Sequence, residues 1–324
     1  LITRRRFIIG TGGLLGTAAL NACGAVEKVA APTAMTGTST VEHAAGTTEV
    51  PAEPIRVVTT DQIFPVYLIS LGLPPAGALN DVDKVLDDVA PLLPDDLEID
   101  SIERIGDRGE PNLESIALIS PDFIVGTEVE GTLELYDQLS EMAPTVLIER
   151  GANGDWRQRF LALAVAVGRS DQAAEVEANY EQMIAALPDE VRKAIVAFIR
   201  PSGEQFRIDS TPAAFAGSVA TDAGIPVLIA PEGVGEVAEG GGFVNLSLEL
   251  LDVVVDADLI VVPDFRSLGV EEASIPQFES NALWETLPAV QARRVIQVPG
   301  LVYNGGSHYA AELLLREIER ALRG

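Results

Sequence analysis

The chain has few of the residues that usually hold metals or cross-link a fold. Its 324 residues include one cysteine and two histidines. A single cysteine cannot form an intramolecular disulfide, so burial has to supply the stability. His43 lies in a polar N-terminal stretch, which leaves only His308 in the body of the chain. Zinc and manganese sites built on imidazoles or thiolates need several such ligands, so we predict no metal site.

Positive charge and aromatic rings are also scarce. The chain has 22 basic residues against 49 acidic ones, for a formal net charge of -27 at pH 7, and only three of the basic residues are lysine. A surface this acidic repels phosphate backbones, so we expect no nucleic-acid partner. Aromatic residues make up 5% of the chain, which is little for the wall of stacked rings that cobalamin would favour.

Motifs for nucleophilic and phosphate chemistry are missing as well. The segment Gly305–Tyr309 reads GGSHY and lacks the closing glycine of a nucleophile elbow. No G-x-x-x-x-G-K phosphate loop is present. Ser307 beside His308 fits a glycine turn followed by a helix N-cap better than a catalytic dyad. The sequence therefore predicts no catalytic residues, and a protein that is not an enzyme.

The first 22 residues resemble a bacterial export signal. Thr3–Ile9 reads TRRRFII and resembles the twin-arginine motif. The weakly apolar segment after the arginines is shorter than the roughly 20 residues that a membrane span needs. Leu20–Cys23 reads LNAC and resembles a lipobox, although asparagine is unusual at its position. We predict a signal peptide at residues 1–22 and a lipid on Cys23, whose two acyl chains suffice for stable anchoring.

Composition and periodicity divide the rest of the chain. Residues 23–54 are small and polar with little to bury, which predicts a disordered tether. Strands then alternate with helices, which is typical of an α/β fold with parallel sheets. Apolar residues recur at helical intervals over Ser170–Leu187, and Ser170 is a candidate N-cap. We predict an N-terminal lobe at 55–169, a connecting helix at 170–188 and a C-terminal lobe at 189–324.

Two segments on either side of the long helix follow one plan. Asn112–Val125 and Asn245–Val262 each show a polar cap, a glutamate in the first helical turn, an apolar helical run, an aspartate and a buried strand. Two halves with one plan predict two lobes with a cleft between them. In the second half we expect strands at 194–199, 206–209, 227–230, 259–262 and 295–298.

These segments carry a family resemblance. In order and spacing, three pairs of segments resemble the substrate-binding proteins of ABC importers for ferric siderophores, haem and cobalamin: Asn112–Ile116 with Ser120–Ile124, Leu246–Leu250 with Asp256–Ile260, and Trp284–Val290 with Arg294–Ile296. The resemblance covers about Ile55 to Leu322. It implies two Rossmann-like lobes joined by a single long, rigid helix, with the ligand cleft between them and only a small hinge motion.

The resemblance also implies a docking role for two glutamates. Glu114 and Glu249 would project from the two lobes to meet arginines of the permease. A glutamate in a first helical turn also favours the helix dipole, so the same residues have a purely structural explanation. The two explanations are compatible.

No motif identifies the ligand-binding residues, so we infer candidates from their positions relative to the predicted strands. Binding sites in parallel sheets lie beyond the carboxyl ends of strands. Guanidinium groups fork onto oxygen donors and so suit a negatively charged ferric complex. Each candidate also has an alternative explanation as an ordinary surface residue. The residues that this rule nominates are Arg108, Arg200, Arg266 and Tyr303.

The resulting hypothesis is a lipid-anchored, extracytoplasmic substrate-binding protein. It would be exported by the twin-arginine route to the periplasm or the outer face of the cytoplasmic membrane. There it would capture an Fe(III)–siderophore complex, hold no covalent cofactor, and deliver its ligand to an ABC permease and its ATPase. The alternatives are a haem or cobalamin receptor, a surface-anchored α/β hydrolase, and an adhesive lipoprotein without a cleft.

Overall fold

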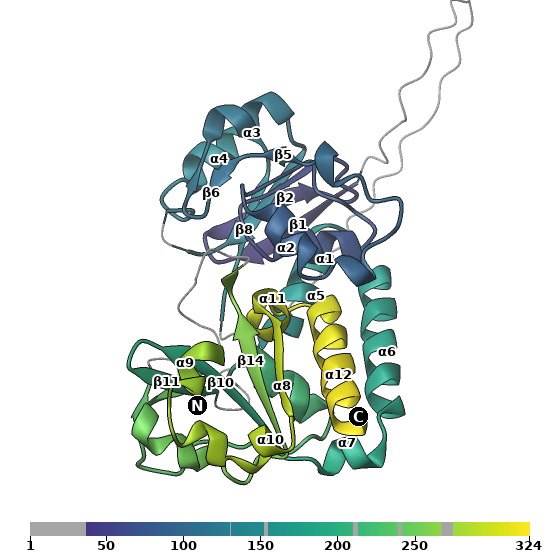
Figure 1. The fold of residues 1–324 in the computed structure, drawn as a ribbon. Coiled ribbons are helices and arrows are strands. Elements are labelled where there is room, and N and C mark those ends of the chain that lie inside the picture. The colour runs from purple at the N-terminus through teal and green to yellow at the C-terminus, as the bar shows by residue number, and fades with distance from the viewer. Residues whose placement is uncertain (1–36, 130, 152–154, 210–212, 239–241, 267–274) are drawn as a thin grey trace, which may run out of the picture.

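Two large β-sheets with surrounding helices and two small hairpins make up the described part of the chain (Figure 1). The computed structural model describes residues 37–324, except for 130, 152–154, 210–212, 239–241 and 267–274. The first sheet has the strand order β5-β4-β3-β8-β9, and the second has the order β12-β13-β11-β10-β14-β15. The predicted α/β fold with two lobes is confirmed. Over the described residues, no helix is both long enough and apolar enough to cross a membrane.

The N-terminal lobe is built on a sheet whose strands are all parallel. A small hairpin, β6 (Gly106–Asp107) and β7 (Glu110–Pro111), carries Arg108 in its turn. The strands of the sheet are β3 (Val57–Thr59), β4 (Gly77–Ala78), β5 (Glu103–Arg104), β8 (Phe123–Thr127) and β9 (Thr145–Ile148). The helices are α1 (Phe64–Ser70), α2 (Val82–Asp87), η1 (Ala90–Leu92), η2 (Ile99–Ser101), α3 (Leu113–Ile119), α4 (Tyr136–Met142) and α5 (Trp156–Ala166).

The C-terminal lobe has a mixed sheet. Its strands are β10 (Val196–Ser202), β11 (Gln205–Asp209), β12 (Glu236–Val237), β13 (Phe243–Ser247), β14 (Leu259–Asp264) and β15 (Val295–Pro299). β10, β14 and β15 are parallel, whereas β10, β11, β13 and β12 pair antiparallel in that order. The prediction of a parallel sheet is therefore wrong for the C-terminal lobe. A two-residue turn at Gly203, with φ +60°, folds β11 back on β10.

The other elements of this lobe also depart from expectation in places. The strand expected at 227–230 is reduced to one bridge between Val196 and Val227. The helix expected after Ser247 forms as a 3-10 helix, η4 (Leu248–Val254), which is interrupted at Leu250. The remaining helices are α7 (Asp189–Lys193), α8 (Phe215–Asp222), α9 (Ile275–Glu279), η6 (Trp284–Thr286), α10 (Pro288–Gln291), α11 (Gly300–Asn304) and α12 (His308–Arg323).

Two aspartates explain why the halves share one plan. The carboxylate of Asp122, just before β8, accepts hydrogen bonds at 2.8 Å from the backbone N–H groups of Ile55 and Arg56, which lead into β3. Asp258, just before β14, accepts one at 2.9 Å from Ile195, which leads into β10. β8 pairs with β3, and β14 pairs with β10. Each aspartate therefore holds the start of its own strand beside the start of the neighbouring strand.

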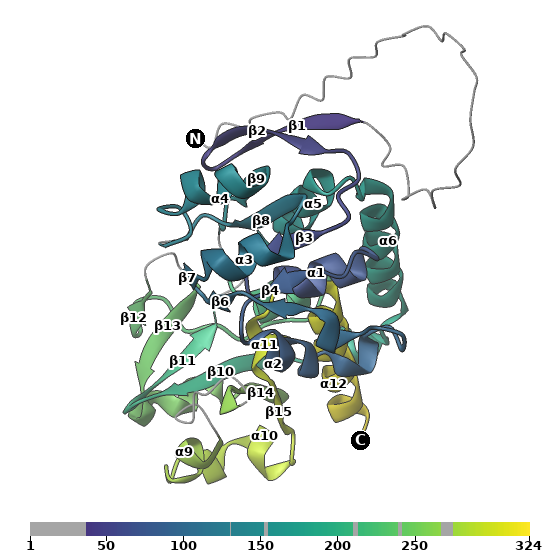
Figure 2. The ribbon, with the colours of Figure 1, turned by 90° about the horizontal axis from the view of Figure 1, so that it is seen from above.

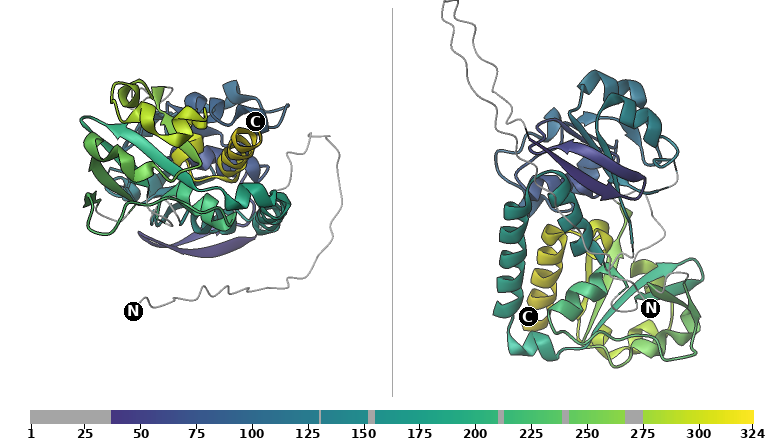
Figure 3. Two further views of the ribbon diagram at one scale, coloured as in Figure 1. Left: turned by 60° about the horizontal axis from the view of Figure 1, so that its bottom comes forward. Right: turned by 180° about the vertical axis from the view of Figure 1, so that it is seen from behind.

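The long helix α6 (Ser170–Ala186) forms where helical periodicity predicted it. Its N-cap is Arg169, so Ser170 is the first helical residue and does not cap the helix. Figure 3 shows α6 and α12 side by side along one edge of the molecule. One hydrophobic cluster contains buried residues of α1 and α2 together with residues of β10, α8, α11 and α12. Because the two lobes share this core, wide separation would expose apolar surface to water.

Residues 38–51, which we predicted to belong to a disordered tether, form a hairpin. Its strands are β1 (Thr38–His43) and β2 (Gly46–Pro51), and they lie across the N-terminal lobe (Figure 2). Val41 and Val50 are buried in the core of that lobe, and the Thr48 hydroxyl donates to the Thr145 carbonyl at 3.0 Å. The tether prediction is therefore wrong for this segment, because two valines supply the burial that the average composition hides. Residues 23–36, Cys23 and the predicted signal lie outside the described residues.

Candidate ligand-binding site

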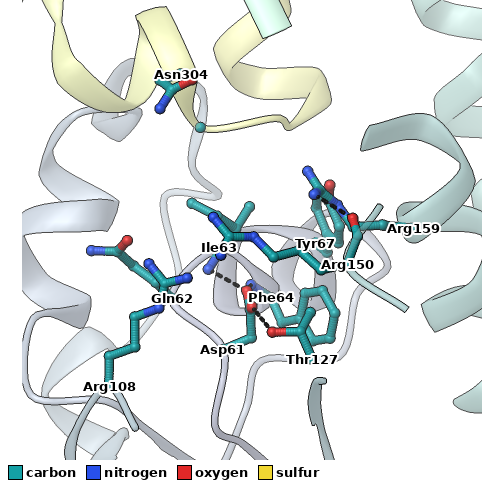
Figure 4. A pocket seen from close by; sticks show the side chains of 11 residues that line it. Asp61, Gln62, Ile63, Phe64, Tyr67, Arg108, Thr127, Arg150, Arg159 and Asn304 are labelled. Atoms are coloured by element: carbon teal, nitrogen blue, oxygen red, sulfur yellow. Dashed lines mark hydrogen bonds between the residues drawn. The ribbon is translucent and has the colours of Figure 1, made fainter. Parts of the chain in front are cut away.

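An open pocket lies where the two lobes meet (Figure 4). The N-terminal lobe contributes residues that follow or end its parallel strands, among them Asp61 after β3, Thr127 at the end of β8 and Arg150 after β9. The C-terminal lobe contributes Asn304 and Gly305, at the end of α11. The site thus lies beyond the carboxyl ends of the first sheet, as expected for parallel strands.

Three arginines line the N-terminal wall of the pocket. They are Arg108 in the β6–β7 turn, Arg150, and Arg159 of α5. The Arg159 guanidinium donates to the Arg150 carbonyl at 2.9 Å. Partial burial lowers the pKa of Arg150, and repulsion from Arg108 and Arg159 lowers it further. Like charges held this close favour a negatively charged occupant.

Asp61, the acidic residue in the described lining, offsets part of this charge, but one carboxylate against three arginines leaves the lining cationic. Asp61 accepts a hydrogen bond from the Thr127 hydroxyl at 2.8 Å. It also accepts bonds from the backbone N–H groups of Ile63, at 2.8 Å, and Phe64, at 3.2 Å. These bonds hold the start of α1 and fix the position of the Asp61 carboxylate in the pocket wall.

Side chains of the N-terminal lobe bind both ends of the α11 segment. The Asp88 carboxylate accepts a hydrogen bond from the backbone N–H of Leu301 at 2.9 Å. The Tyr67 hydroxyl, which lies in the pocket wall, donates to the carbonyl oxygen of Gly306. Gly306 has φ +66°, and a Cβ there would lie 3.0 Å from an Arg159 nitrogen. The C-terminal wall of the pocket is therefore fixed directly against the N-terminal lobe.

The four candidate ligand-binding residues lie in different places in the structure. Arg108 lines the pocket. Tyr303 is buried in α11, one residue before the pocket residue Asn304. Arg200 does not follow β10, as we expected, but lies within it, because the strand continues into a hairpin. Arg266 is exposed and donates to Asp264 through Nε at 2.8 Å, and it does not belong to the described pocket lining.

Sequence reasoning missed most of the pocket lining, including two of its three arginines. Arg150 follows β9, so the strand-end rule also points to it. Arg159 sits within a helix, and no local signal distinguishes it.

A second charged cluster joins the helices behind the pocket. Glu177 of α6 binds the imidazole Nε2 of His308 at 2.9 Å and the Nε of Arg157 at 2.8 Å. The rings of Trp156 and Phe160 pack on His308. Burial lowers the pKa of His308 and outweighs the effect of Glu177. Burial raises the pKa of Glu177, but the hydrogen bonds from His308 and Arg157 leave it below its usual value.

The same cluster decides between two interpretations of the Ser307–His308 pair. The Ser307 side chain accepts a hydrogen bond from the backbone N–H of Ala310 at 3.2 Å and caps α12. The predicted glycine turn and N-cap are confirmed. The Nε2 atom of His308 binds Glu177, and its Nδ1 has no hydrogen-bond partner among the described residues, so Ser307 and His308 form no dyad.

The two glutamates proposed for docking are exposed, one in each lobe. Glu114 lies in the first turn of α3, where the Asn112 side chain accepts a hydrogen bond from the N–H of Ser115 at 2.9 Å. Glu249 lies in the first turn of η4, where Ser247 accepts a bond from the N–H of Glu249 at 3.4 Å. The predicted caps at Asn112 and Ser247 are both present, and neither glutamate belongs to the pocket lining.

Two α/β lobes with a cationic pocket between them are the architecture of a substrate-binding protein. Residues 72–300 match the periplasmic binding protein family, and the chain belongs to that family. Its members are substrate-binding proteins of transporters rather than enzymes, and they work outside the cytoplasm.

Individual relatives agree with this membership. The chain is 29% identical over 321 residues, 94% of both chains, to the probable siderophore-binding lipoprotein YfiY of Bacillus subtilis. It is 28% identical over 257 residues to the Fe(3+)-citrate-binding protein YfmC of the same organism, covering 77% of this chain and 75% of YfmC. The petrobactin-binding protein YclQ of B. subtilis has the same fold, with a TM-score of 0.70, 20% identity, and coverage of 89% of this chain and 100% of YclQ.

Proposed function

We propose that the chain captures an anionic ferric siderophore in the cleft and delivers it to the permease of an ABC importer. The observation that carries this proposal is the convergence of Arg108, Arg150 and Arg159 on one pocket. Carboxylate and catecholate oxygens of a ferric chelate accept paired hydrogen bonds from guanidinium groups. The names of YfiY and YfmC support an iron chelate as the ligand class.

A titration of pocket variants tests this proposal. We expect Arg108→Ala with Arg150→Ala to weaken binding of ferric dicitrate at least tenfold per substitution, because hydrogen bonds to charged groups contribute about 1.5–3 kcal/mol each. Added salt should weaken binding to the parent protein more than to the double variant. The matched control is Arg316→Ala, an exposed arginine of α12 paired with Glu312.

Quenching of tryptophan fluorescence provides the measurement. Trp156 is the reporter, since its carbonyl accepts a hydrogen bond from the pocket residue Tyr67. Trp284, in contrast, is buried in the core of the C-terminal lobe and is not part of the described pocket lining. Ferric catecholate, a neutral ferric trihydroxamate, haem and cobalamin complete the panel. Parent-like affinity in the double variant, or preference for the neutral complex, would contradict the proposed anionic site.

We also propose that the chain is exported by the twin-arginine route and anchored through a lipid on Cys23. This proposal keeps the predicted division into residues 55–169, 170–188 and 189–324, except that the hairpin at 38–51 joins the N-terminal lobe. Cys23→Ser should move the protein from the membrane to the soluble fraction without changing ligand affinity, because the described pocket lining begins only at Asp61. Retention of the Cys23→Ser protein in carbonate-washed membranes would rule out anchoring through a lipid on Cys23.

A further inference from the structure

The imidazole of His43 connects the β1–β2 hairpin to the edge of the N-terminal sheet. His43 is the last residue of β1, and the hairpin lies beside β9, the edge strand of that sheet (Figure 2). The Nδ1 atom of His43 accepts the backbone N–H of Leu147 in β9 at 3.4 Å and that of Ala45 in the hairpin turn at 3.2 Å. The backbone N–H of Ala44 donates to the Leu147 carbonyl at 3.0 Å. The hairpin turn therefore binds both main-chain polar groups of Leu147.

The hydrogen bonds around the ring determine which of its nitrogens carries a proton. A backbone N–H can only donate, so the Nδ1 atom has to be an unprotonated acceptor. The other nitrogen, Nε2, lies 2.9 Å from the Thr48 hydroxyl. That hydroxyl donates its own proton to the Thr145 carbonyl at 3.0 Å, so it accepts from His43. The contacts therefore require the neutral imidazole with its proton on Nε2.

Protonation of His43 is incompatible with these contacts, because an imidazolium ion carries N–H groups on both nitrogens and Nδ1 could no longer accept. Tyr136 of α4 is the titratable group beside the half-buried ring, with its hydroxyl 3.5 Å from Nε2. β9 contributes no titratable side chain, and Glu42 and Glu49 lie on the other face of the hairpin. Burial lowers the pKa of His43, and no charged side chain of the described residues adds to this effect.

We propose that His43 is a pH-sensitive latch, which holds the hairpin turn on β9 while it is neutral and releases the turn when it is protonated. A proton from solvent binds Nδ1 once the bonds from Ala45 and Leu147 have opened. The released hairpin keeps Val41 and Val50 as its buried contacts. Because the hairpin follows residues 23–36 closely in the chain, the latch controls how firmly that segment is attached to the lobe. This inference does not depend on the ligand proposed for the cleft.

The direction of the pH dependence follows from the two states of the turn. In the released turn the imidazole has its ordinary pKa of about 6.5, whereas in the bound turn the pKa is lower. The released state therefore binds more protons, and release increases as the pH falls below about 6.5, by at most about tenfold per pH unit. Below the lowered pKa, both states are protonated and release reaches a plateau. Since members of the family work outside the cytoplasm, the latch meets the pH of the surroundings.

Hydrogen exchange of backbone amides in the parent protein and two variants tests the latch. Between pH 7.5 and pH 5, after correction for intrinsic exchange rates, the protection of the Ala44 and Leu147 amides should fall at least about threefold. The amides of β8 report the stability of the whole lobe and should change less. His43→Asn is the matched variant, because its Oδ1 accepts hydrogen bonds as Nδ1 does but does not titrate, so its protection should not follow the same pH dependence. His43→Ala should leave the turn weakly protected at both pH values.

The tautomer of His43 is measured on the parent protein and needs no variant. Long-range nitrogen–proton NMR at pH 7.5 should show a proton on Nε2 and an unprotonated Nδ1. The opposite tautomer, or pH-independent protection of the Ala44 and Leu147 amides, overturns the latch. The latch is also overturned if His43→Asn shows the pH dependence of the parent, because another group then responds to pH. Equal loss of protection in β8 has the same consequence, because the whole lobe then loosens. All of these outcomes leave the proposed ligand site untouched.

Discussion

Reversing Glu114 and Glu249 to arginine is expected to abolish ligand uptake while the protein still folds and binds. Both side chains are exposed, and they lie on different lobes outside the pocket lining. If they meet arginines of the permease, a reversed charge sets like charges against each other, which costs more than a lost contact. The fold should tolerate the change, because a first-turn glutamate contributes at most about 1 kcal/mol through the helix dipole.

Three measurements on the double reversal distinguish docking from ligand binding. Thermal melts and chelate titrations should match those of the parent protein, whereas transport in cells that carry the cognate permease should be lost. Glu285→Arg is the control, since Glu285 is an exposed glutamate in η6 of the C-terminal lobe. Normal transport by the double reversal would end the docking proposal. Weakened chelate binding would instead place the glutamates in the ligand site.

The fold was predictable from sequence where local chemistry repeats. Asp122 and Asp258 each bind the backbone at the start of the neighbouring strand, so the repeated aspartate-then-strand pattern reports a real equivalence between the lobes. The direction of β11 was not predictable in the same way, because one turn at Gly203 decides between a hairpin and a crossover. The hairpin at 38–51 was not predicted, because its two buried valines hardly change the average composition of a polar segment.

The candidate site was predictable only in part, because its residues come from distant segments. The strand-end rule found Arg108, which lies in a turn beside the carboxyl ends of the strands. It placed Arg200 wrongly, since β10 continues to Ser202 and then turns back into β11. Arg159 reaches the pocket through the packing of α5 against the turn at Gly306, and only the tertiary structure reveals that contact.

The buried cluster around Glu177 leads to the second large expected effect, on stability. Glu177→Gln removes the carboxylate that binds both His308 and Arg157. A hydrogen bond to a charged group contributes about 1.5–3 kcal/mol, and Arg157 keeps Asp222 at 3.6 Å and Glu181 at 3.5 Å after Glu177 is replaced. The Arg157 side chain is 33% exposed, and water will compensate it in part, so we expect a loss at the lower end of that range.

The pH dependence of the parent protein follows from the same contacts. The folded-state pKa values of His308 and Glu177 both lie below their usual values. The unfolded chain therefore binds more protons on acidification, and the free energy of unfolding falls as the pH drops below about 6.5 for His308 and about 4.5 for Glu177. His308→Gln should reduce the slope between pH 6.5 and 5, because it removes the first of these groups.

Denaturant unfolding at pH 7.5 and pH 5 measures both effects. Glu181→Gln is the matched control for Glu177→Gln, since Glu181 lies one turn further along α6 and approaches the same arginine, at 3.5 Å, with a side chain that is 70% exposed. Exposed ion pairs contribute at most about 1 kcal/mol, so the control should unfold close to the parent. Equal losses in the two variants would show that Glu177 behaves as a surface residue. A much larger loss for Glu177→Gln would identify the Arg157–Glu177–His308 cluster as the contact that holds α5, α6 and α12 together behind the cleft.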